Sequence, residues 1–177
     1  MEYGLQPYQL EPVRRDDFEV DDDVIDNVQI REEQEEEWRK YNKEWCECQR
    51  CGLMPTAVEC LCCHEIGNVV RKMNLGLEDE LKCIVEHFEF EFVCLHPGVI
   101  RTALVARHDV RRNQLVDPIP NETFRLKAYR QFTYWVHDRL GKAIRRVIPA
   151  CVVGRIRQEY PSDNGAYVGF KEADLQA

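Results

Sequence analysis

The stretch that decides the fold is WCECQRC at residues 45–51, followed by ECLCC at residues 59–63 and by a lone Cys83. Seven of the nine cysteines of this 177-residue chain lie between positions 46 and 83. A two-residue spacer, as between Cys48 and Cys51, lets one turn present two sulfurs to one metal ion. Zinc takes four thiolate or imidazole ligands, so seven thiolates are too many for one ion. Two zinc ions have eight ligand positions, and seven cysteines fill them if one sulfur bridges both ions.

The sequence therefore predicts a cluster of two zinc ions held by cysteines. His64 and His87 are close enough to replace a cysteine, but a histidine beside such a site is more often a surface or core residue. Cys94 and Cys151 lie outside the cluster, and we expect both to be small core residues. The predicted ligands are Cys46, Cys48, Cys51, Cys60, Cys62, Cys63 and Cys83.

Two other uses of the cysteines are open at this point, a disulfide framework and a redox pair. Disulfides suit short secreted chains, but the first residues, MEYGLQPYQL, have neither the basic region nor the apolar run of a signal peptide. Adjacent Cys62 and Cys63 are poor partners for each other, because disulfide geometry is demanding. No two-residue-spaced cysteine pair opens a helix after a strand, as a redox pair would.

The length and the composition indicate one domain with a tail. Hydrophobic residues make up 44% of the chain, which is enough for a core. The longest apolar run, residues 147–153, is far shorter than the roughly 20 residues of a membrane span, so we expect no transmembrane segment. Many free thiols without a secretion signal predict a reducing compartment, the cytoplasm or alternatively the nucleus.

The net charge of −8 is the sum of an acidic N-terminal segment and a basic C-terminal segment. Residues 1–45 contain fifteen acids and six bases, whereas residues 121–157 contain nine arginines or lysines and only Glu122 and Asp138 as acids. Charge blocks of this size can attract one another or select different partners.

The periodicity predicts a mainly helical domain with a cysteine-rich dinuclear zinc knot and little β-structure. The clearest helix covers residues 123–141, with Asn121 as its cap and Gly141 at its end. Residues 77–95 are ambiguous, because Phe88, Phe90 and Phe92 alternate as in a strand while other residues fit helical spacing. Further helices are expected over residues 64–73, 97–110 and 149–161. The predicted organisation is an acidic disordered tail (1–27), a charged helix (28–44), the zinc domain (45–172) and a short tail (173–177).

Several motifs together resemble one known family, the cytoplasmic C-terminal (ballast) domain of P2X purinoceptor 7. They are the order of the seven cysteines, AYR at residues 128–130, IPAC at 148–151, and RIRQEYP followed by GAYVGF at 155–170. The similarity covers roughly residues 42–172. It implies a mostly helical domain around a dinuclear zinc site, here without the receptor's channel.

The resemblance also implies a guanine-nucleotide pocket for GDP or GTP. Three residues match pocket residues of the family and become candidate nucleotide ligands: Arg125, Tyr129 and Arg157. Three other pocket positions differ, because a histidine, an arginine and a lysine of the family fall at Leu126, Val153 and Ser162. Loss of polar contacts at those positions weakens a nucleotide site.

We therefore expect a non-enzymatic, cytosolic zinc module that interacts with a protein partner, whose identity the sequence does not give. No glycine-rich phosphate loop and no nucleophile motif are present, and all-cysteine zinc sites are usually closed and structural rather than catalytic. The alternative function is nucleic-acid binding by the basic C-terminal half, where arginines and lysines alternate with Tyr129, Phe132, Tyr134 and Trp135. The more ordinary interpretation of these aromatic residues is a helix core.

Overall fold

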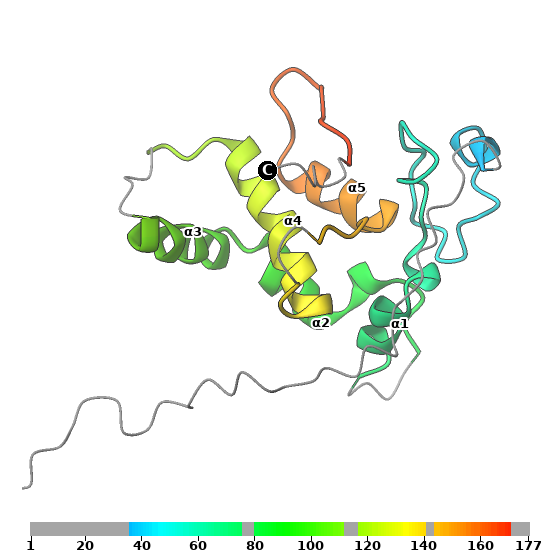
Figure 1. Ribbon diagram of the computed structural model, residues 1–177, viewed down its shortest axis with the longest axis horizontal. Coiled ribbons are helices and arrows are strands. Elements are labelled where there is room, and N and C mark those ends of the chain that lie inside the picture. The colour runs from blue at the N-terminus through cyan, green and yellow to red at the C-terminus, as the bar shows by residue number, and fades with distance from the viewer. Residues whose placement is uncertain (1–35, 76–79, 112–116, 141–143, 171–177) are drawn as a thin grey trace, which may run out of the picture.

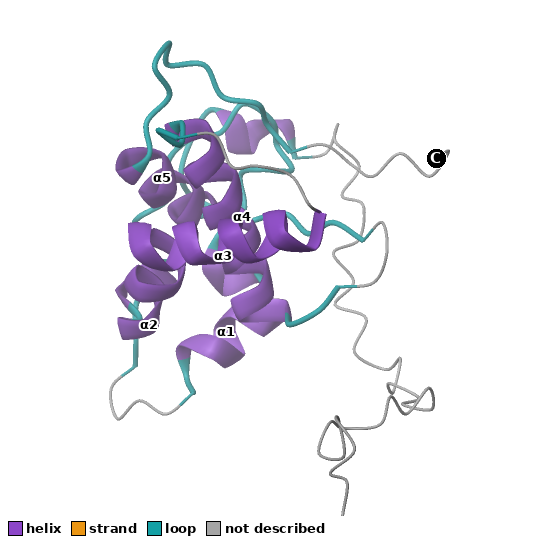
Figure 2. Cartoon of the chain, turned by 90° about the vertical axis from the view of Figure 1, so that its left-hand side faces the viewer, coloured by secondary structure: helices purple, strands orange, loops and turns teal. Residues whose placement is uncertain are grey.

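The computed structural model describes residues 36–75, 80–111, 117–140 and 144–170, and these form helices and loops without a β-strand (Figures 1 and 2). The mainly helical fold class is thus confirmed. Of the predicted domain boundaries, those at 27 and 172 lie outside the described residues. In chain order the elements are the 3₁₀-helices η1 (Glu37–Lys40) and η2 (Cys63–Glu65), α1 (Gly67–Met73), the 3₁₀-helix η3 (Ile84–Glu86), α2 (Phe88–Phe90), the π-helical turn η4 (Glu91–Leu95), α3 (Pro97–Arg111), α4 (Asn121–His137) and α5 (Ala150–Glu159).

The segment before the cysteines differs from its prediction. Of the helix expected over residues 28–44, the described part contains only η1, and the chain turns away after Lys40. The indole Nε1 of Trp45 donates to the carbonyl oxygens of Arg39 and Asn42, at 2.9 and 2.8 Å. The buried Trp45 thus fixes a compact turn where good helix formers alone predict a continued helix.

The ambiguous stretch around the three phenylalanines is helical. Phe90 is 1% exposed, whereas Phe88 and Phe92 are 62% and 63% exposed. A strand would place all three side chains on one face, so this burial pattern belongs to the helical turns α2 and η4. Phe90 packs edge-to-face on Phe132 of α4, with ring centroids 6.4 Å apart.

Helices α3, α4 and α5 form most of the remaining domain, and α4 packs against the other two. The helix α4 ends at His137, four residues before the expected Gly141, because Asp138 adopts a left-handed backbone with φ 54°. Asn121 is the first residue of α4 rather than its cap, a position that Pro120 holds. The predicted helices over 64–73, 97–110 and 149–161 correspond to α1 with η2, to α3 and to α5.

The core joins the helices to the cysteine-rich segment at one end of the molecule. Fully buried side chains from α4 and α5, including Phe132, Val152 and Ile156, belong to one apolar cluster with Trp45 and the buried cysteines. The backbone N–H of Ala150, at the start of α5, donates to the carbonyl oxygen of Leu61 at 2.9 Å. The segment that carries ECLCC therefore lies directly against α5 (Figure 1).

The C-terminal segment folds back onto the same cysteine-rich loop. Glu59, which is 5% exposed, accepts a hydrogen bond from the backbone N–H of Phe170 at 2.9 Å and another from Thr56 Oγ1 at 2.8 Å. Gly169 suits this close approach, because a Cβ there would lie 3.0 Å from a carboxylate oxygen of Glu59 and that side chain would have to move. Among the described residues, no helix combines the length and the apolar character that crossing a membrane requires.

Candidate metal centre

Seven cysteine thiols gather between the cysteine-rich segment and the start of α5, in two groups that share one member. Within each group all sulfur atoms lie within 4.8 Å of one another. Cys48 belongs to both groups. The first group is Cys46, Cys48, Cys51 and Cys62, and the second is Cys48, Cys63, Cys83 and Cys151.

The sulfur separations suit tetrahedral metal coordination rather than disulfides. The Sγ atoms of Cys46 and Cys48 are 3.8 Å apart, those of Cys48 and Cys51 are 3.7 Å apart, and those of Cys63 and Cys83 are 3.9 Å apart. A disulfide bond is about 2.05 Å long, and all these cysteines are free. Zinc–sulfur bonds of about 2.3 Å in a tetrahedron place neighbouring sulfurs ~3.8 Å apart. Each group therefore has the dimensions of a four-thiolate site.

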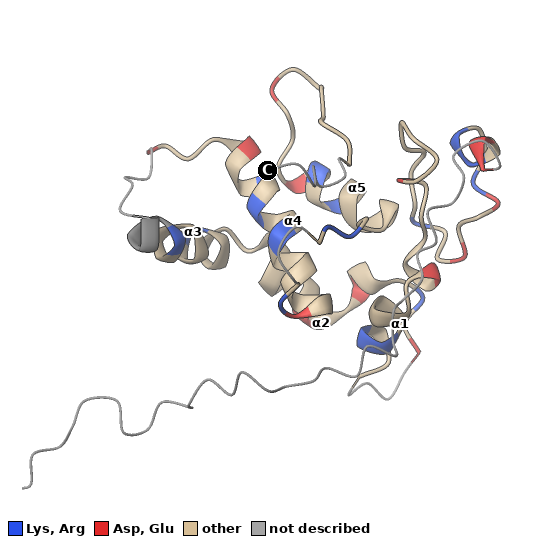
Figure 3. Cartoon of the chain, viewed as in Figure 1, with Lys and Arg blue, Asp and Glu red and all other residues tan. Residues whose placement is uncertain are grey.

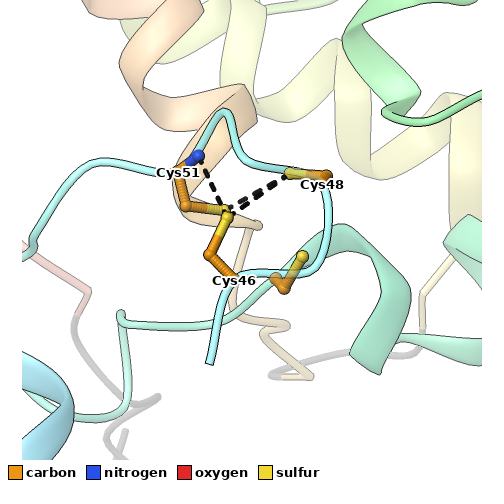
Figure 4. Close-up of side chains that lie close together, drawn as sticks. Cys46, Cys48 and Cys51 are labelled. Carbon is orange, nitrogen blue, oxygen red and sulfur yellow. Dashed lines mark hydrogen bonds between the residues drawn. The ribbon is translucent and has the colours of Figure 1, made fainter. Parts of the chain in front are cut away.

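The first group is built by a tight turn that WCECQRC encodes (Figure 4). Gln49 adopts a left-handed backbone with φ 59°, which folds the chain between Cys48 and Cys51 so that both sulfurs face one point. The backbone N–H of Cys51 donates to the Sγ of Cys46 at 3.4 Å. This donor favours the thiolate, the form that binds metals, but burial is the larger cause and raises the pKa of Cys46 above its usual value.

The fourth member of that group, Cys62, is held by a partly buried ion pair between Arg39 and Glu65. Cys62 is the N-cap of η2, and its backbone N–H donates to Glu65 Oε1 at 2.7 Å. Glu65 accepts two hydrogen bonds from the guanidinium of Arg39, which also donates to the carbonyl oxygen of Cys60 at 2.8 Å. Through these hydrogen bonds Arg39 stabilises the conformation of the ECLCC loop.

The surroundings of the shared residue, Cys48, favour its thiolate form. Hydrogen bonds from the surrounding thiols, with Cys151 first and Cys51 second, hold the pKa of Cys48 far below its usual value. By contrast, Cys94 lies apart from both groups, and burial raises its pKa to about 12. The buried thiol Cys94 is therefore a neutral core residue, as the sequence predicts.

Two cysteines do not lie where the sequence predicts. Cys60 was expected among the ligands, but it is in neither group, and its thiol donates to the carbonyl oxygen of Met54 at 3.7 Å. Cys151 was expected to be a small core residue, but its Sγ is within 4.8 Å of those of Cys48, Cys63 and Cys83. Cys151 is the second residue of α5 and lies far along the sequence from the other cysteines, so its spacing did not indicate a ligand. The IPAC motif that contains Cys151 was the sequence feature that could have indicated it.

Neither histidine near the cluster belongs to it. The Nε2 of His64 is 2.8 Å from the carbonyl oxygen of Lys82. His87 is 3% exposed, stacks on Phe88 with ring centroids 4.8 Å apart, and accepts a hydrogen bond from the backbone N–H of Glu89. Burial lowers the pKa of His87, so the neutral imidazole is the favoured form.

The three predicted nucleotide ligands lie together, beside the C-terminal segment. Arg125 is on α4, Arg157 is on α5, and both side chains lie over the ring of Tyr167 in the C-terminal loop. The guanidinium carbons of Arg125 and Arg157 are 5.0 and 4.4 Å from the centroid of that ring. Arg125 also donates to the carbonyl oxygen of Tyr160 at 3.0 Å. Within the described part of the chain, the Tyr129 hydroxyl and the Arg157 Nε are buried and form no hydrogen bond of good geometry, although the Arg157 side chain is close enough to act on Tyr129.

The side chains at the three positions where the resemblance predicts other residues add no polar group to this cluster, although the backbone N–H of Ser162 donates to the Tyr167 hydroxyl at 3.3 Å. Leu126 is 58% exposed and Val153 is buried at 8%. The Ser162 hydroxyl lies 2.7 Å from Asn164 Oδ1, within its own turn. Lys and Arg residues occur along both α4 and α5 (Figure 3), but Arg125 and Lys127 of α4 are buried. However, Phe132 is 1% exposed and Trp135 packs against the core, so these aromatic residues do not form a stacking surface for bases.

Comparison with known protein families gives a match over residues 8–171 to the P2X purinoreceptor 7 intracellular domain. The chain belongs to this family. The match begins in the acidic N-terminal segment, earlier than the residues 42–172 that the motifs indicate. It therefore includes the segment expected to be a separate tail.

Two curated relatives of this family show how far the similarity extends. The mouse (Mus musculus) protein, P2X purinoceptor 7, is 28% identical over 132 residues, which are 72% of this chain and 20% of the relative. The rat (Rattus norvegicus) P2X purinoceptor 7 is 27% identical over 133 residues, again 72% of this chain and 20% of the relative. The matched part of the chain thus covers about a fifth of the length of these relatives.

Proposed function

We propose that this chain is a structural zinc module that holds two zinc ions, with the Cys48 sulfur as the bridge between them. The observation that carries the proposal is the membership of Cys48 in both four-sulfur groups. Four ligands for each ion, with one shared, require seven sulfurs, and the two groups contain seven different cysteines. The ligand count made from the sequence is kept, while Cys151 takes the place of Cys60.

The donor set fits zinc and a structural role. Thiolates are soft ligands that favour zinc among the common divalent ions, and six of the seven are buried, with Cys46 half-buried. Four sulfurs around each ion leave no position for a bound water, which a catalytic zinc needs. We therefore propose that the module is not an enzyme. When bound, the ions cross-link the cysteine-rich segment to α5.

Cobalt titration tests the shared sulfur directly. Tetrahedral Co²⁺–thiolate sites absorb visible light strongly, so we expect the absorbance to rise up to two equivalents of Co²⁺ per chain and then to stop. Zn²⁺ should displace both equivalents, since it binds thiolates more tightly. Saturation at one equivalent, or no thiolate band at all, would rule out the dinuclear proposal.

The role of such a module is to present surfaces to a protein partner in the cytoplasm, as the family's intracellular character suggests. Support comes from the exposed aromatic side chains Phe88 and Phe92, which lie four residues apart on one helical face. Pull-down from cytosolic extract with wild-type chain and with the F88S/F92S variant tests this role. If the wild-type chain and the F88S/F92S variant retain a partner equally, that partner does not bind through Phe88 and Phe92.

We propose guanine-nucleotide binding as a second function, which rests on the family resemblance and on one feature of this chain. That feature is a buried polar cluster, in which the Tyr129 hydroxyl and the Arg157 Nε form no hydrogen bond of good geometry among the described residues and lie beside the guanidinium of Arg125. Burial raises the pKa of the Tyr129 hydroxyl, which keeps it neutral and able to donate. A phosphate would satisfy such donors with charge-assisted hydrogen bonds.

Calorimetric titration with GDP, and with ADP as the comparison, tests this second function. We expect Arg157→Ala to weaken GDP binding about tenfold or more, because a charged hydrogen bond contributes ~1.5–3 kcal/mol. Tyr167→Ala should strengthen binding if the ring now covers the two arginines. Heat signals that are absent for the wild-type chain and for Tyr167→Ala would show that the pocket is lost.

A further inference from the structure

Residues 161–170, the last that the structure describes, run from the end of α5 back toward the cysteine-rich loop, and we call them the C-terminal strap (orange to red in Figure 1). Within the described part of the chain, the one backbone–backbone hydrogen bond of the strap joins the N–H of Gly165 to the carbonyl oxygen of Ser162 at 3.2 Å. Val168 is 71% exposed, whereas Tyr167 beside it is half-buried. A segment with so few backbone hydrogen bonds opens at a low cost in free energy, so a few contacts with the domain decide its position.

The first of these contacts holds the ring of Tyr167 against two guanidinium groups. The ring centroid is 4.4 Å from the guanidinium carbon of Arg157 and 5.0 Å from that of Arg125. Both distances are within the roughly 6 Å of a cation–π contact. The two arginines and Tyr167 all act on the buried hydroxyl of Tyr129. The strap therefore lies over the residues that we propose to bind a nucleotide.

The second contact joins the strap to Glu59 of the cysteine-rich loop. Glu59 is 5% exposed and accepts a hydrogen bond from the backbone N–H of Phe170 at 2.9 Å. Gly169 suits this approach, since a Cβ there would lie 3.0 Å from a carboxylate oxygen of Glu59. Tyr167 and Phe170 are only three residues apart, so each contact keeps the groups of the other at a high effective concentration. Loss of the Glu59 contact should therefore release the Tyr167 ring as well.

Tyr167 uses a part of each arginine that an aromatic ligand also needs. A guanidinium group donates hydrogen bonds to phosphate oxygens in its own plane and attracts aromatic rings over that plane. Arg125 donates to the carbonyl oxygen of Tyr160 at 3.0 Å, and Tyr167 supplies the aromatic contact of both Arg125 and Arg157. The purine ring of a nucleotide can take this position only when the strap has moved away.

We propose that the C-terminal strap is an autoinhibitory segment, in which the ring of Tyr167 occupies the position of a ligand's aromatic base on Arg125 and Arg157. The hydrogen bond from Phe170 to Glu59 keeps this segment closed. The inference concerns the regulation of the nucleotide site, and it rests on the proposed nucleotide binding for the identity of the ligand. The closed and open positions of the strap differ without any ligand, so the strap itself has a separate test.

The first test follows the Nε–H proton signals of Arg125 and Arg157 by NMR in the full chain without ligand. A ring over a guanidinium group shifts the signals of its protons, so the signals report whether Tyr167 is in place. Tyr167→Ala gives the signal positions of the open strap. Val168→Ala is the matched control in the same segment, because this side chain is exposed, and it should leave both signals as in the wild-type chain.

Two variants remove the hydrogen bond to Glu59 from opposite sides. Glu59→Ala removes the acceptor, and Phe170→Pro removes the donor without changing the cysteine-rich loop. We expect both variants to move the two arginine signals toward their positions in Tyr167→Ala. Arginine signals that stay at their wild-type positions in a folded Glu59→Ala or Phe170→Pro chain would overturn the proposal, since the contact with Glu59 would then not hold the ring.

The second test compares the affinities for GDP and for inorganic pyrophosphate by calorimetry, because pyrophosphate has the charged groups without the ring. If the strap is open in about one molecule in ten, Tyr167→Ala and Glu59→Ala should bind GDP about tenfold more tightly than the wild-type chain. Pyrophosphate affinity should not change, and Val168→Ala should bind GDP as the wild-type chain does. Weaker GDP binding by Tyr167→Ala, or an equal gain for pyrophosphate, would overturn the proposal. Absence of GDP binding to every chain would contradict the nucleotide proposal alone, and the NMR signals then decide whether the strap is held as proposed.

Discussion

At the scale of single residues, the two cysteines with exchanged roles give the clearest contrast. We expect Cys151→Ala to remove about one zinc ion per chain and to lower the free energy of unfolding by ~3 kcal/mol or more, because metal binding energy is folding energy in such sites. Cys60→Ala removes one buried sulfur outside both groups and should cost only about 1 kcal/mol. Zinc content and urea unfolding of both variants measure this. Equal zinc content in the two would contradict the assignment of Cys151.

The first cysteine turn can be tested in the same way. Cys51→Ser should release the ion of the first group and reduce order in residues 45–63, since a serine hydroxyl is a poor replacement for a thiolate. Cys94→Ala is the matched control, because Cys94 is buried outside both groups. Hydrogen exchange across residues 45–63 reports the result. Equal protection of this segment in both variants would count against Cys51 as a ligand.

His87 gives the chain a pH-dependent stability whose sign follows from its burial. Because the pKa of His87 is lowered in the folded state, the unfolded chain binds more protons, and stability rises with pH. The contribution is complete above the unfolded pKa of about 6.5 and is lost as the pH falls toward the lower folded pKa. Glu89 and Lys72 also act on this group.

The contribution of His87 is measured as the difference in the free energy of unfolding by urea between the wild-type chain and His87→Phe, from pH 8 to pH 5. Metal release at low pH affects both proteins alike and therefore cancels in this difference. We expect the difference between the two stability curves to shrink or reverse below about pH 6.5. Parallel curves over the whole range would show that His87 does not titrate as its burial requires.

At the scale of elements, the contact between the Glu59 loop and the C-terminal segment joins residues that are 111 positions apart. Glu59→Ala should leave two donors, the Phe170 N–H and the Thr56 hydroxyl, without their acceptor and cost ~1–3 kcal/mol. The exchange rate of the Phe170 amide should rise strongly, while amides within α4 stay protected. Gly169→Ala should act in the same direction through steric contact with Glu59, and an unchanged Phe170 exchange rate in both variants would contradict this prediction.

The elements that the sequence predicted well are the long helices, in which apolar residues keep helical spacing over several turns. The helices α3, α4 and α5 follow from helical spacing and proline positions, but the end of α4 depends on the left-handed backbone of Asp138. The stretch 28–44 is rich in good helix formers, yet the buried Trp45 and its two hydrogen bonds end η1 early. Tertiary contacts of this kind override local propensity, and they are not visible in the local pattern.

At the scale of the whole molecule, the number of candidate ligands was predictable and their identity only in part. Short spacing brings Cys46, Cys48 and Cys51 together whatever the rest of the fold does. The contribution of Cys151 depends on how α5 packs against the ECLCC loop, where the Ala150 N–H meets the Leu61 carbonyl oxygen. Metal ions bound at the proposed site would link the cysteine-rich segment to the helical layer.

The most direct test of this account is the metal content of the chain purified without added metal, measured by inductively coupled plasma mass spectrometry against protein concentration from amino-acid analysis. We predict two zinc ions per wild-type chain and fewer than two in Cys48→Ser, with Cys60→Ser unchanged at two. One zinc ion or none in a folded wild-type chain, or a loss in Cys60→Ser equal to that in Cys48→Ser, would contradict it.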